Sequence, residues 1–78
     1  MTAEEMFAKI GYEVKIDGEE IIKFENDDGF YTVVSVTFDK IKKIYVVDCL
    51  GRAVYIQPHL HKAINQMVSE LGWLDETD

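Results

Sequence analysis

The stretch LHKAINQMVSELGW, residues 60–73, has the clearest secondary-structure signal in this chain. Its apolar residues recur at intervals of three and four, which is typical of a helix that buries one face. Pro58 suits the first helical position, where its missing N–H leaves no hydrogen bond unmade. Gly72 supplies the left-handed position that ends a helix, and we expect Trp73 to fold back onto Val68. The stretch therefore predicts a C-terminal helix whose buried side consists of Leu60, Ile64, Met67, Val68 and Leu71.

A shorter helix is predicted at the other end of the chain, in the segment AEEMFAKIGYE. Thr2 and Glu5 have the spacing of a capping box, in which the Thr2 hydroxyl accepts from the Glu5 N–H and the Glu5 carboxylate accepts from the Thr2 N–H. Gly11 is placed to end this helix, and Tyr12 to pack back on Phe7 in a Schellman motif. The two ends of the chain therefore use the same cap chemistry.

Between the predicted helices the apolar residues alternate with polar ones, which is typical of β-strands with one buried face. Turn signals rich in Asp, Asn and Gly separate the strands, and connections this short favour an antiparallel meander. The strands are predicted near residues 12–16, 20–26, 30–38, 43–49 and 52–57. The fold class is therefore α+β, an antiparallel sheet of about five strands with a helix at each end, both packed on one face.

The strand register decides which side chains face the helices, because a slip of one residue turns every side chain over. At residues 17–18 a three-residue loop, or a bulge at residues 21–22, partitions the side chains better than a two-residue loop. A two-residue loop is expected at residues 50–51 and a four-residue loop over 39–42. The expected cross-strand pairs are Tyr12–Phe24, Val14–Ile22, Val36–Tyr45, Val34–Val47, Val47–Val54 and Tyr45–Ile56.

This register places apolar residues on both faces of the sheet. The inner face, which the helices are expected to cover, holds Tyr12, Val14, Ile22, Phe24, Val34, Val36, Phe38, Tyr45, Val47, Val54 and Ile56. The outer face holds a candidate protein interface, formed by Ile21, Tyr31, Val33, Ile44, Val46 and Tyr55. Two short helices cannot cover both faces, and contiguous exposed apolar residues often mark an interface. The alternative is a solvated face whose β-branched residues serve strand propensity alone.

Length and composition limit the domain organisation and the compartment. With 78 residues, 47% of them apolar, the chain is expected to form one small domain over residues 1–78, with 75–78 as a disordered tail. The single cysteine, Cys49, cannot form an internal disulfide, which fits a reducing compartment. The N-terminus lacks the features of a secretory signal, and no segment reaches membrane-spanning length. A cytoplasmic protein is expected.

The charge balance argues against several partners and the polar residues against most chemistry. Eight basic residues against fifteen acids give a net charge of −7, so no direct binding to nucleic acid is expected. His59 and His61 fall in the first turn of a helix, where residues two apart point about 200° away from each other. The turn at residues 26–29 resembles the front of a calcium loop, but its first and last ligand positions lack carboxylates. No metal, cofactor, small-molecule substrate or enzymatic activity is expected.

The two terminal segments carry a resemblance to known proteins. LHKAINQMVSELGW is similar to the C-terminal helix, of AINxxxxELGW type, in small uncharacterised proteins encoded by phages and prophages of Gram-positive bacteria. Such proteins also tend to open with a helix like AEEMFAKIGYE, whereas the strands between resemble theirs only in pattern. The resemblance implies a phage-derived origin, a bacterial cytoplasm and a small α+β fold. It implies no activity and no catalytic residue.

These observations favour a non-enzymatic module that binds a protein partner, or a second copy of itself, through the outer sheet face. Tyrosines suit such a surface because they combine a large contact area with a polar tip. The alternative is an acidic decoy that mimics nucleic acid and binds a basic host protein. Its signature would be carboxylates arrayed at phosphate-like spacing on one side, with binding that weakens in salt. No membrane partner is expected.

Overall fold

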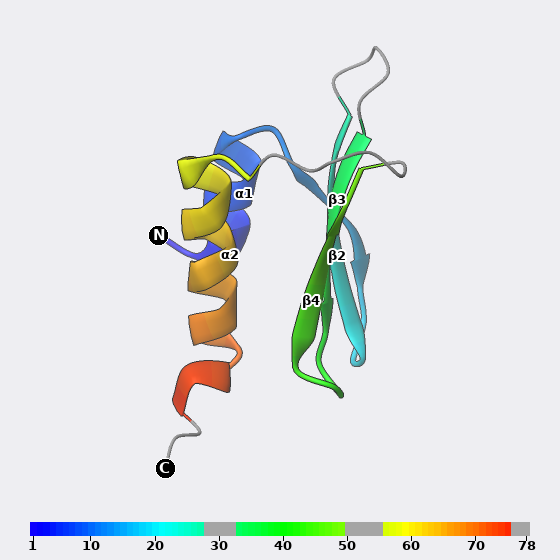
Figure 1. Cartoon of the computed structure of the whole chain (residues 1–78), viewed down its shortest axis with the longest axis vertical. Coiled ribbons are helices and arrows are strands. Elements are labelled where there is room, and N and C mark those ends of the chain that lie inside the picture. The colour runs from blue at the N-terminus through cyan, green and yellow to red at the C-terminus, as the bar shows by residue number, and fades with distance from the viewer. Residues whose placement is uncertain (28–32, 50–55, 76–78) are drawn as a thin grey trace.

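The computed structural model describes residues 1–27, 33–49 and 56–75. Within these ranges the chain forms an antiparallel sheet in the order β1-β2-β3-β4 and helices before and after it. The helices make one layer and the sheet the other (Figure 1). The predicted α+β class is therefore confirmed. The elements are α1 (Ala3–Lys9), β1 (Glu13–Asp17), β2 (Ile21–Asp27), β3 (Val33–Asp39), β4 (Ile44–Asp48), α2 (Pro58–Glu70) and the 3-10 helix η1 (Trp73–Asp75).

Helix α1 begins and ends with the predicted motifs. The Glu5 N–H donates to Thr2 Oγ1 over 3.2 Å, and the Thr2 N–H donates to Glu5 Oε1 over 2.9 Å, which completes the capping box. The bond from the Thr2 N–H also lowers the pKa of the Glu5 carboxyl. At the other end Gly11 has a φ of 92°, and the Tyr12 N–H donates to the Phe7 carbonyl over 2.9 Å. This is the long hydrogen bond of a Schellman motif, and the Phe7 and Tyr12 rings meet edge to face.

Helix α2 starts and stops as its sequence predicts. Pro58 occupies its first position, and the helix ends before Gly72, which has a φ of 78° and donates its N–H to the Ser69 carbonyl over 3.0 Å. Trp73 then begins η1, and its ring centroid lies 6.3 Å from that of Phe38 in the sheet. The aromatic residue after the α2 cap thus links the helix layer to the sheet.

The two α-helices run antiparallel, so the end of α2 lies beside the start of α1. The Ala3 N–H donates to Glu70 Oε2 over 2.7 Å, and Gln66 Nε2 donates to the same oxygen over 2.9 Å. A carboxylate near a helix N-terminus interacts favourably with the helix dipole. The last turn of α2 therefore caps the first turn of α1.

The predicted register of β1 and β2 is wrong, although the inner-face residues are assigned to the correct side. Val14 pairs with Phe24, and an irregularity between Val14 and Ile16 then shifts the register so that Ile16 pairs with Lys23. The turn is shorter than expected and lies later in the chain, at residues 19–20, with the Gly18 N–H donating to the Ile21 carbonyl over 2.9 Å. Without the extra residue of the bulge this turn would bring Val14 opposite Glu25. The bulge restores the apolar pairing of Val14 and turns Ile16 to the outer face.

The predicted register of β3 and β4 is also wrong, by two residues. Val36 pairs with Val47, and Phe38 pairs with Tyr45. The loop covers residues 40–43 because Asp39 Oδ1 accepts hydrogen bonds from the N–H groups of residues 41 and 42, each over 3.0 Å. An aspartate that binds the next N–H groups stabilises the start of a turn. A shift of two residues keeps every side chain on its predicted face.

The core lies between the helices and the inner face of the sheet. Phe7 of α1 stacks on Phe24 of β2, with ring centroids 4.0 Å apart, and both rings contact Phe38 of β3 edge to face. These rings and Val36 are fully buried. The α2 side of the core consists of Leu60, Ala63, Ile64, Met67 and Val68.

The helices cover less of the inner face than predicted. The expected inner residues Val14, Ile22, Val34 and Val47 are partly buried against the core. Tyr45 and Ile56, also expected to be covered, are exposed. Ile56 lies outside any strand, so the expected Tyr45–Ile56 pair is not formed. Val54 and most of the predicted fifth strand lie outside the described residues, as does the expected tail except Asp75, which ends η1.

No helix within the described ranges is long and apolar enough to cross a membrane.

Candidate functional site

Strand β4 is the most exposed apolar element of the described sheet. Ile44 and Val46 lie on the outer face and are 48% and 55% exposed, while Tyr45, on the inner face, is 44% exposed. In the described part of the chain β4 has one neighbour, β3, so it is an edge of the described sheet. We call Ile44, Tyr45 and Val46 the β4 edge. This edge presents apolar side chains on both faces of the sheet.

A second apolar pair lies at the opposite side of the outer face. Ile16 and Ile21 are exposed on β1 and β2, and polar side chains separate them from β4. Lys23 and Thr37 lie between Ile16 and Val46 in one cross-strand row. The described residues of the outer face therefore do not form one contiguous apolar patch, and the most exposed of these apolar side chains, Val46, lies on β4.

The described residues of the predicted interface differ in how exposed they are. Ile21, Ile44 and Val46 are exposed on the outer face, whereas Val33 is half-buried and pairs with Asp27. Tyr31 and Tyr55 lie outside the described residues. The predicted interface omits Ile16, which lies on the outer face beyond the bulge, and Tyr45, which is predicted to lie on the covered face. No local signal in the sequence marks either of them, because both depend on how distant segments pack.

A row of acidic residues crosses the outer face next to the apolar residues. Glu13 pairs with Glu25, Glu25 with Ser35, and Ser35 with Asp48, so carboxylates occupy three of the four strands. Neighbouring strands lie about 4.8 Å apart, and like charges directly opposite each other destabilise a sheet. Lys15 Nζ approaches Glu13 Oε1 at 3.8 Å, but both side chains are largely exposed, so this pair contributes little. The row therefore concentrates negative charge across the described strands of the outer face.

Two polar groups lie beside the core, the Tyr12 phenol and the Cys49 thiol. Burial raises the pKa of the Tyr12 phenol, and a side-chain hydrogen bond with Asn26 partly opposes this. Cys49 is a free thiol and is buried. The Tyr12 phenol therefore stays protonated at neutral pH and serves as a partner for Asn26.

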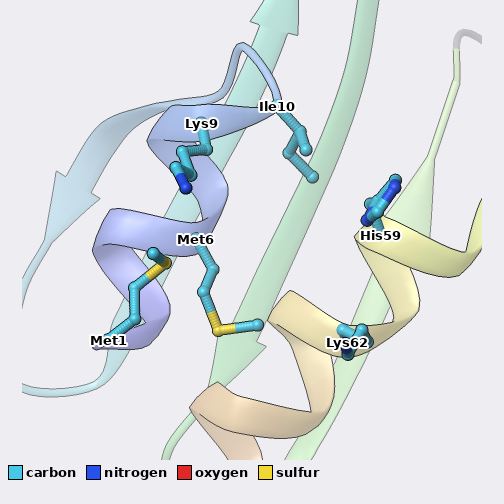
Figure 2. A pocket seen from close by; sticks show the side chains of 6 residues that line it. All are labelled: Met1, Met6, Lys9, Ile10, His59 and Lys62. Atoms are coloured by element: carbon cyan, nitrogen blue, oxygen red, sulfur yellow. The ribbon is translucent and has the colours of Figure 1, made fainter.

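A groove of about 240 Å³ lies between the two helices, away from the sheet's outer face (Figure 2). Methionine and isoleucine side chains from the N-terminal segment meet basic side chains from both helices there. Typical small-molecule sites have volumes of about 300–1,000 Å³, so this groove is below the usual size. Its lining includes neither a carboxylate nor a thiol. The residues that line it are Met1, Met6, Lys9, Ile10, His59 and Lys62.

The histidines do not gather with other metal ligands. His59 lines the groove, and His61 is exposed on α2. Among residues 1–27, 33–49 and 56–75, no three His, Cys, Asp or Glu side chains are placed to hold a metal ion. The two histidines therefore lie apart from any cluster of metal ligands in the described part of the chain.

No protein-family model, no curated protein and no solved structure matches the chain. Its own surface is therefore the basis on which its function can be inferred.

Proposed function

We propose that this chain is a non-enzymatic protein-interaction module that binds a protein partner through the β4 edge and the apolar residues of the outer sheet face. The observation that supports this most directly is the exposure of Ile44, Tyr45 and Val46 on both faces of an edge strand. The proposal includes a setting in the bacterial cytoplasm and a phage-derived origin, the latter supported by the likeness of the two terminal helices.

Covering the β4 edge would be favourable. Full burial of a Val, Ile or Leu side chain contributes roughly 1.5–3 kcal/mol, and the three residues of the β4 edge are about half exposed. A partner that covered them would also bind the free N–H and C=O groups of an edge strand, which is how many sheets recognise extended chains. A fifth strand, predicted near residues 52–57, would instead cover β4 from within the same chain.

The acidic row supports a second candidate, a decoy that occupies the nucleic-acid site of a basic protein. Glu13, Glu25 and Asp48 lie in one cross-strand row, which is closer to an array than the sequence suggested. Such binding would rest on charge and would weaken steeply with salt. Binding through the β4 edge would rest on apolar contact and would survive salt.

One experiment separates the two candidates. Tagged chain would be expressed in bacterial cells and its partners recovered without cross-linking at about 0.15 M and about 1 M salt. We expect stoichiometric capture at both salt concentrations, lost in Ile44→Lys/Val46→Lys and kept in Asn65→Lys, which adds a charge to the exposed side of α2. The decoy predicts the reverse pattern, with loss at high salt and in Glu25→Gln/Asp48→Asn. A monomeric chain with no partner that distinguishes these variants would contradict both candidates.

A further inference from the structure

We infer that the groove between α1 and α2 binds a short segment of a partner protein in which apolar side chains lie beside carboxylates. The groove belongs to the helix layer, whereas the β4 edge belongs to the sheet, so the inference does not rest on the proposed function. It follows from the chemistry of the groove's lining, from the distribution of charge over the helices and from the size of the groove.

The groove lies where the end of α1 passes the start of α2 (Figure 2). Met6 of α1 and its C-cap residue Ile10, four positions later, point toward α2. His59 and Lys62 are three positions apart on α2. Residues three or four apart lie on the same side of a helix, so each helix contributes one wall. The pairing of two segments from opposite ends of the chain therefore creates the groove.

Half of the lining residues are apolar. Met6 and Ile10 pack against the core and remain partly exposed, and Met1 is 68% exposed. Unbranched methionine side chains adapt to partners of different shape, and for this reason they are common at protein-binding surfaces. An apolar side chain seated in the groove would remove this exposed area from water, which is favourable.

The other half of the lining is basic, and these residues are Lys9, His59 and Lys62. All are exposed, and in the part of the chain that the structure describes no ion pair joins Lys9 or Lys62 to a carboxylate. Glu5, one turn before Lys9, instead accepts the hydrogen bond of the Thr2 N–H. In a chain with a net charge of −7, this groove is therefore a local site of the opposite sign, complementary to carboxylates.

Helix stability does not explain the basic residues of α2. Acids are favourable and cations unfavourable near a helix N-terminus. The first turn of α2 has no acidic residue, and His59 and Lys62 lie near its start. Lys9 differs, because it lies in the last turn of α1, where a cation stabilises the helix. A carboxylate supplied by a partner accounts for the position of Lys62.

The size of the groove favours the side chains of a protein segment over a free small molecule. Its volume of about 240 Å³ is below the roughly 300–1,000 Å³ of typical small-molecule sites. Hydrophobic grooves on protein surfaces bind amphipathic segments whose apolar side chains enter the groove while their polar side chains stay outside. Here the polar side chains of such a segment would meet Lys9 and Lys62, which favours aspartate and glutamate.

Selection from a library of random peptides, with the purified whole chain as the target, tests this inference. We expect the selected peptides to combine leucine, isoleucine or phenylalanine with neighbouring aspartate or glutamate, and to bind more weakly as salt rises. Lys9→Glu and Lys62→Glu should each weaken the binding of a selected peptide about five-fold, because each replaces an attraction by a repulsion. The matched control Lys42→Glu, an exposed lysine in the turn before β4, should change it less than about two-fold.

Two readouts separate apolar contact from charge and binding from folding. Met6→Lys adds a cation to the groove and removes an apolar side chain. It should weaken peptide binding, whereas binding by charge alone would be strengthened. Lys62→Glu should leave the free energy of unfolding in urea unchanged or raise it, because an acid near the start of α2 is favourable. Its weaker binding would then not be due to unfolding.

Several outcomes would overturn the inference. They are a selection that yields no peptide, selected peptides without acidic residues, and peptides whose binding is unchanged in Lys9→Glu and Lys62→Glu. Decanoate, a free aliphatic carboxylate, would also overturn it by binding as tightly as the peptide, because the groove would then take a small amphiphile. Binding that is kept in Ile44→Lys/Val46→Lys supports the groove as a separate site. Binding lost in that variant would place the peptide on the β4 edge and contradict the inference.

Discussion

Tyr12 shows how one side chain connects three parts of the molecule. Its N–H closes the Schellman motif of α1, its ring packs on Phe7, and its hydroxyl group reaches Asn26 of β2. Gly11, directly before it, is needed for its backbone conformation. Its φ of 92° is strained for any residue with a side chain, although an added Cβ would meet Asn26 Oδ1 at an ordinary contact distance of 3.6 Å. The hydrogen bond to Asn26 allows a phenol to be buried without the cost of an unpaired polar group.

Tyr12→Phe should lower stability at neutral pH and flatten its alkaline dependence. At pH 7 the loss of one hydrogen bond should cost about 1 kcal/mol. Burial raises the folded-state pKa of Tyr12 above its ordinary value of 10.0. Below that value both states keep the proton; above it the unfolded chain releases the proton first, so the original protein loses stability as pH rises and the Phe variant lacks this loss.

Urea unfolding of both proteins at pH 7 and at about pH 11 measures the effect, since the remaining titrating groups are common to both. The stability difference should shrink or change sign at the higher pH. A difference that is constant across this range would show that the Tyr12 phenol titrates alike in both states.

At the scale of elements, the two helices depend on each other. α1 has seven residues, well below the length at which an isolated helix is stable in water. Its first turn is held by the Thr2–Glu5 capping box and by Glu70 of α2, and its buried side by Phe7. α2 has no side-chain cap at Gln57 and relies on Pro58 and its apolar face. Contacts between the elements, more than intrinsic helix propensity, therefore stabilise the helix layer.

Glu70→Ala should destabilise the fold by about 1 kcal/mol, because the Ala3 N–H loses its charged acceptor. This N–H is partly buried, so water replaces the lost hydrogen bond only in part. Glu70→Gln keeps an acceptor and should cost less. The sign is informative, since a carboxylate in the last turn of α2 is unfavourable for that helix itself. If Glu70 acted on α2 alone, its removal would stabilise the protein. Thermal and urea unfolding, with Ser69→Ala as the neighbouring control, distinguish these outcomes.

For the whole molecule, stability depends on a small aromatic core beneath one face of a sheet. Stabilities of roughly 0.05–0.15 kcal/mol per residue give about 4–12 kcal/mol for 78 residues. The rings of Phe7, Phe24 and Phe38 are fully buried and in mutual contact, and Tyr45 and Trp73 extend the cluster from Phe38. So few core side chains leave little redundancy.

Phe24→Ala should therefore cost about 3–5 kcal/mol, a large part of the total stability, because the cavity lies where α1 meets the sheet. Val46→Ala, on the exposed face of β4, should cost less than about 1 kcal/mol in the isolated chain. Both are read from urea unfolding at low protein concentration, where a dimer would not contribute. Equal losses at the two positions would mean that the helices do not lie on the face that contains Phe24.

The features that the sequence determined by itself are those whose interactions span a few residues. Thr2 with Glu5 starts α1, Gly11 and Gly72 end their helices, and alternation along β3 places Val36 inside. Each follows from backbone sterics or from hydrogen bonds to near neighbours in the chain. The predicted β3–β4 register is wrong, but each side chain still lies on its predicted face of the sheet, because a shift of two residues does not turn a side chain over.

Only the tertiary structure decided the features that depend on how distant segments meet. The bulge that turns Ile16 outward arises because the Gly18–Ile21 turn and the Val14–Phe24 contact require different registers. Tyr45 is open because two short helices cover the centre of the sheet and not its edge. Alternation along a strand fixes which face a side chain takes, but the area that a second layer covers depends on the lengths and crossing of elements far apart in the chain. The candidate interaction surface follows from that coverage, which local sequence patterns do not encode.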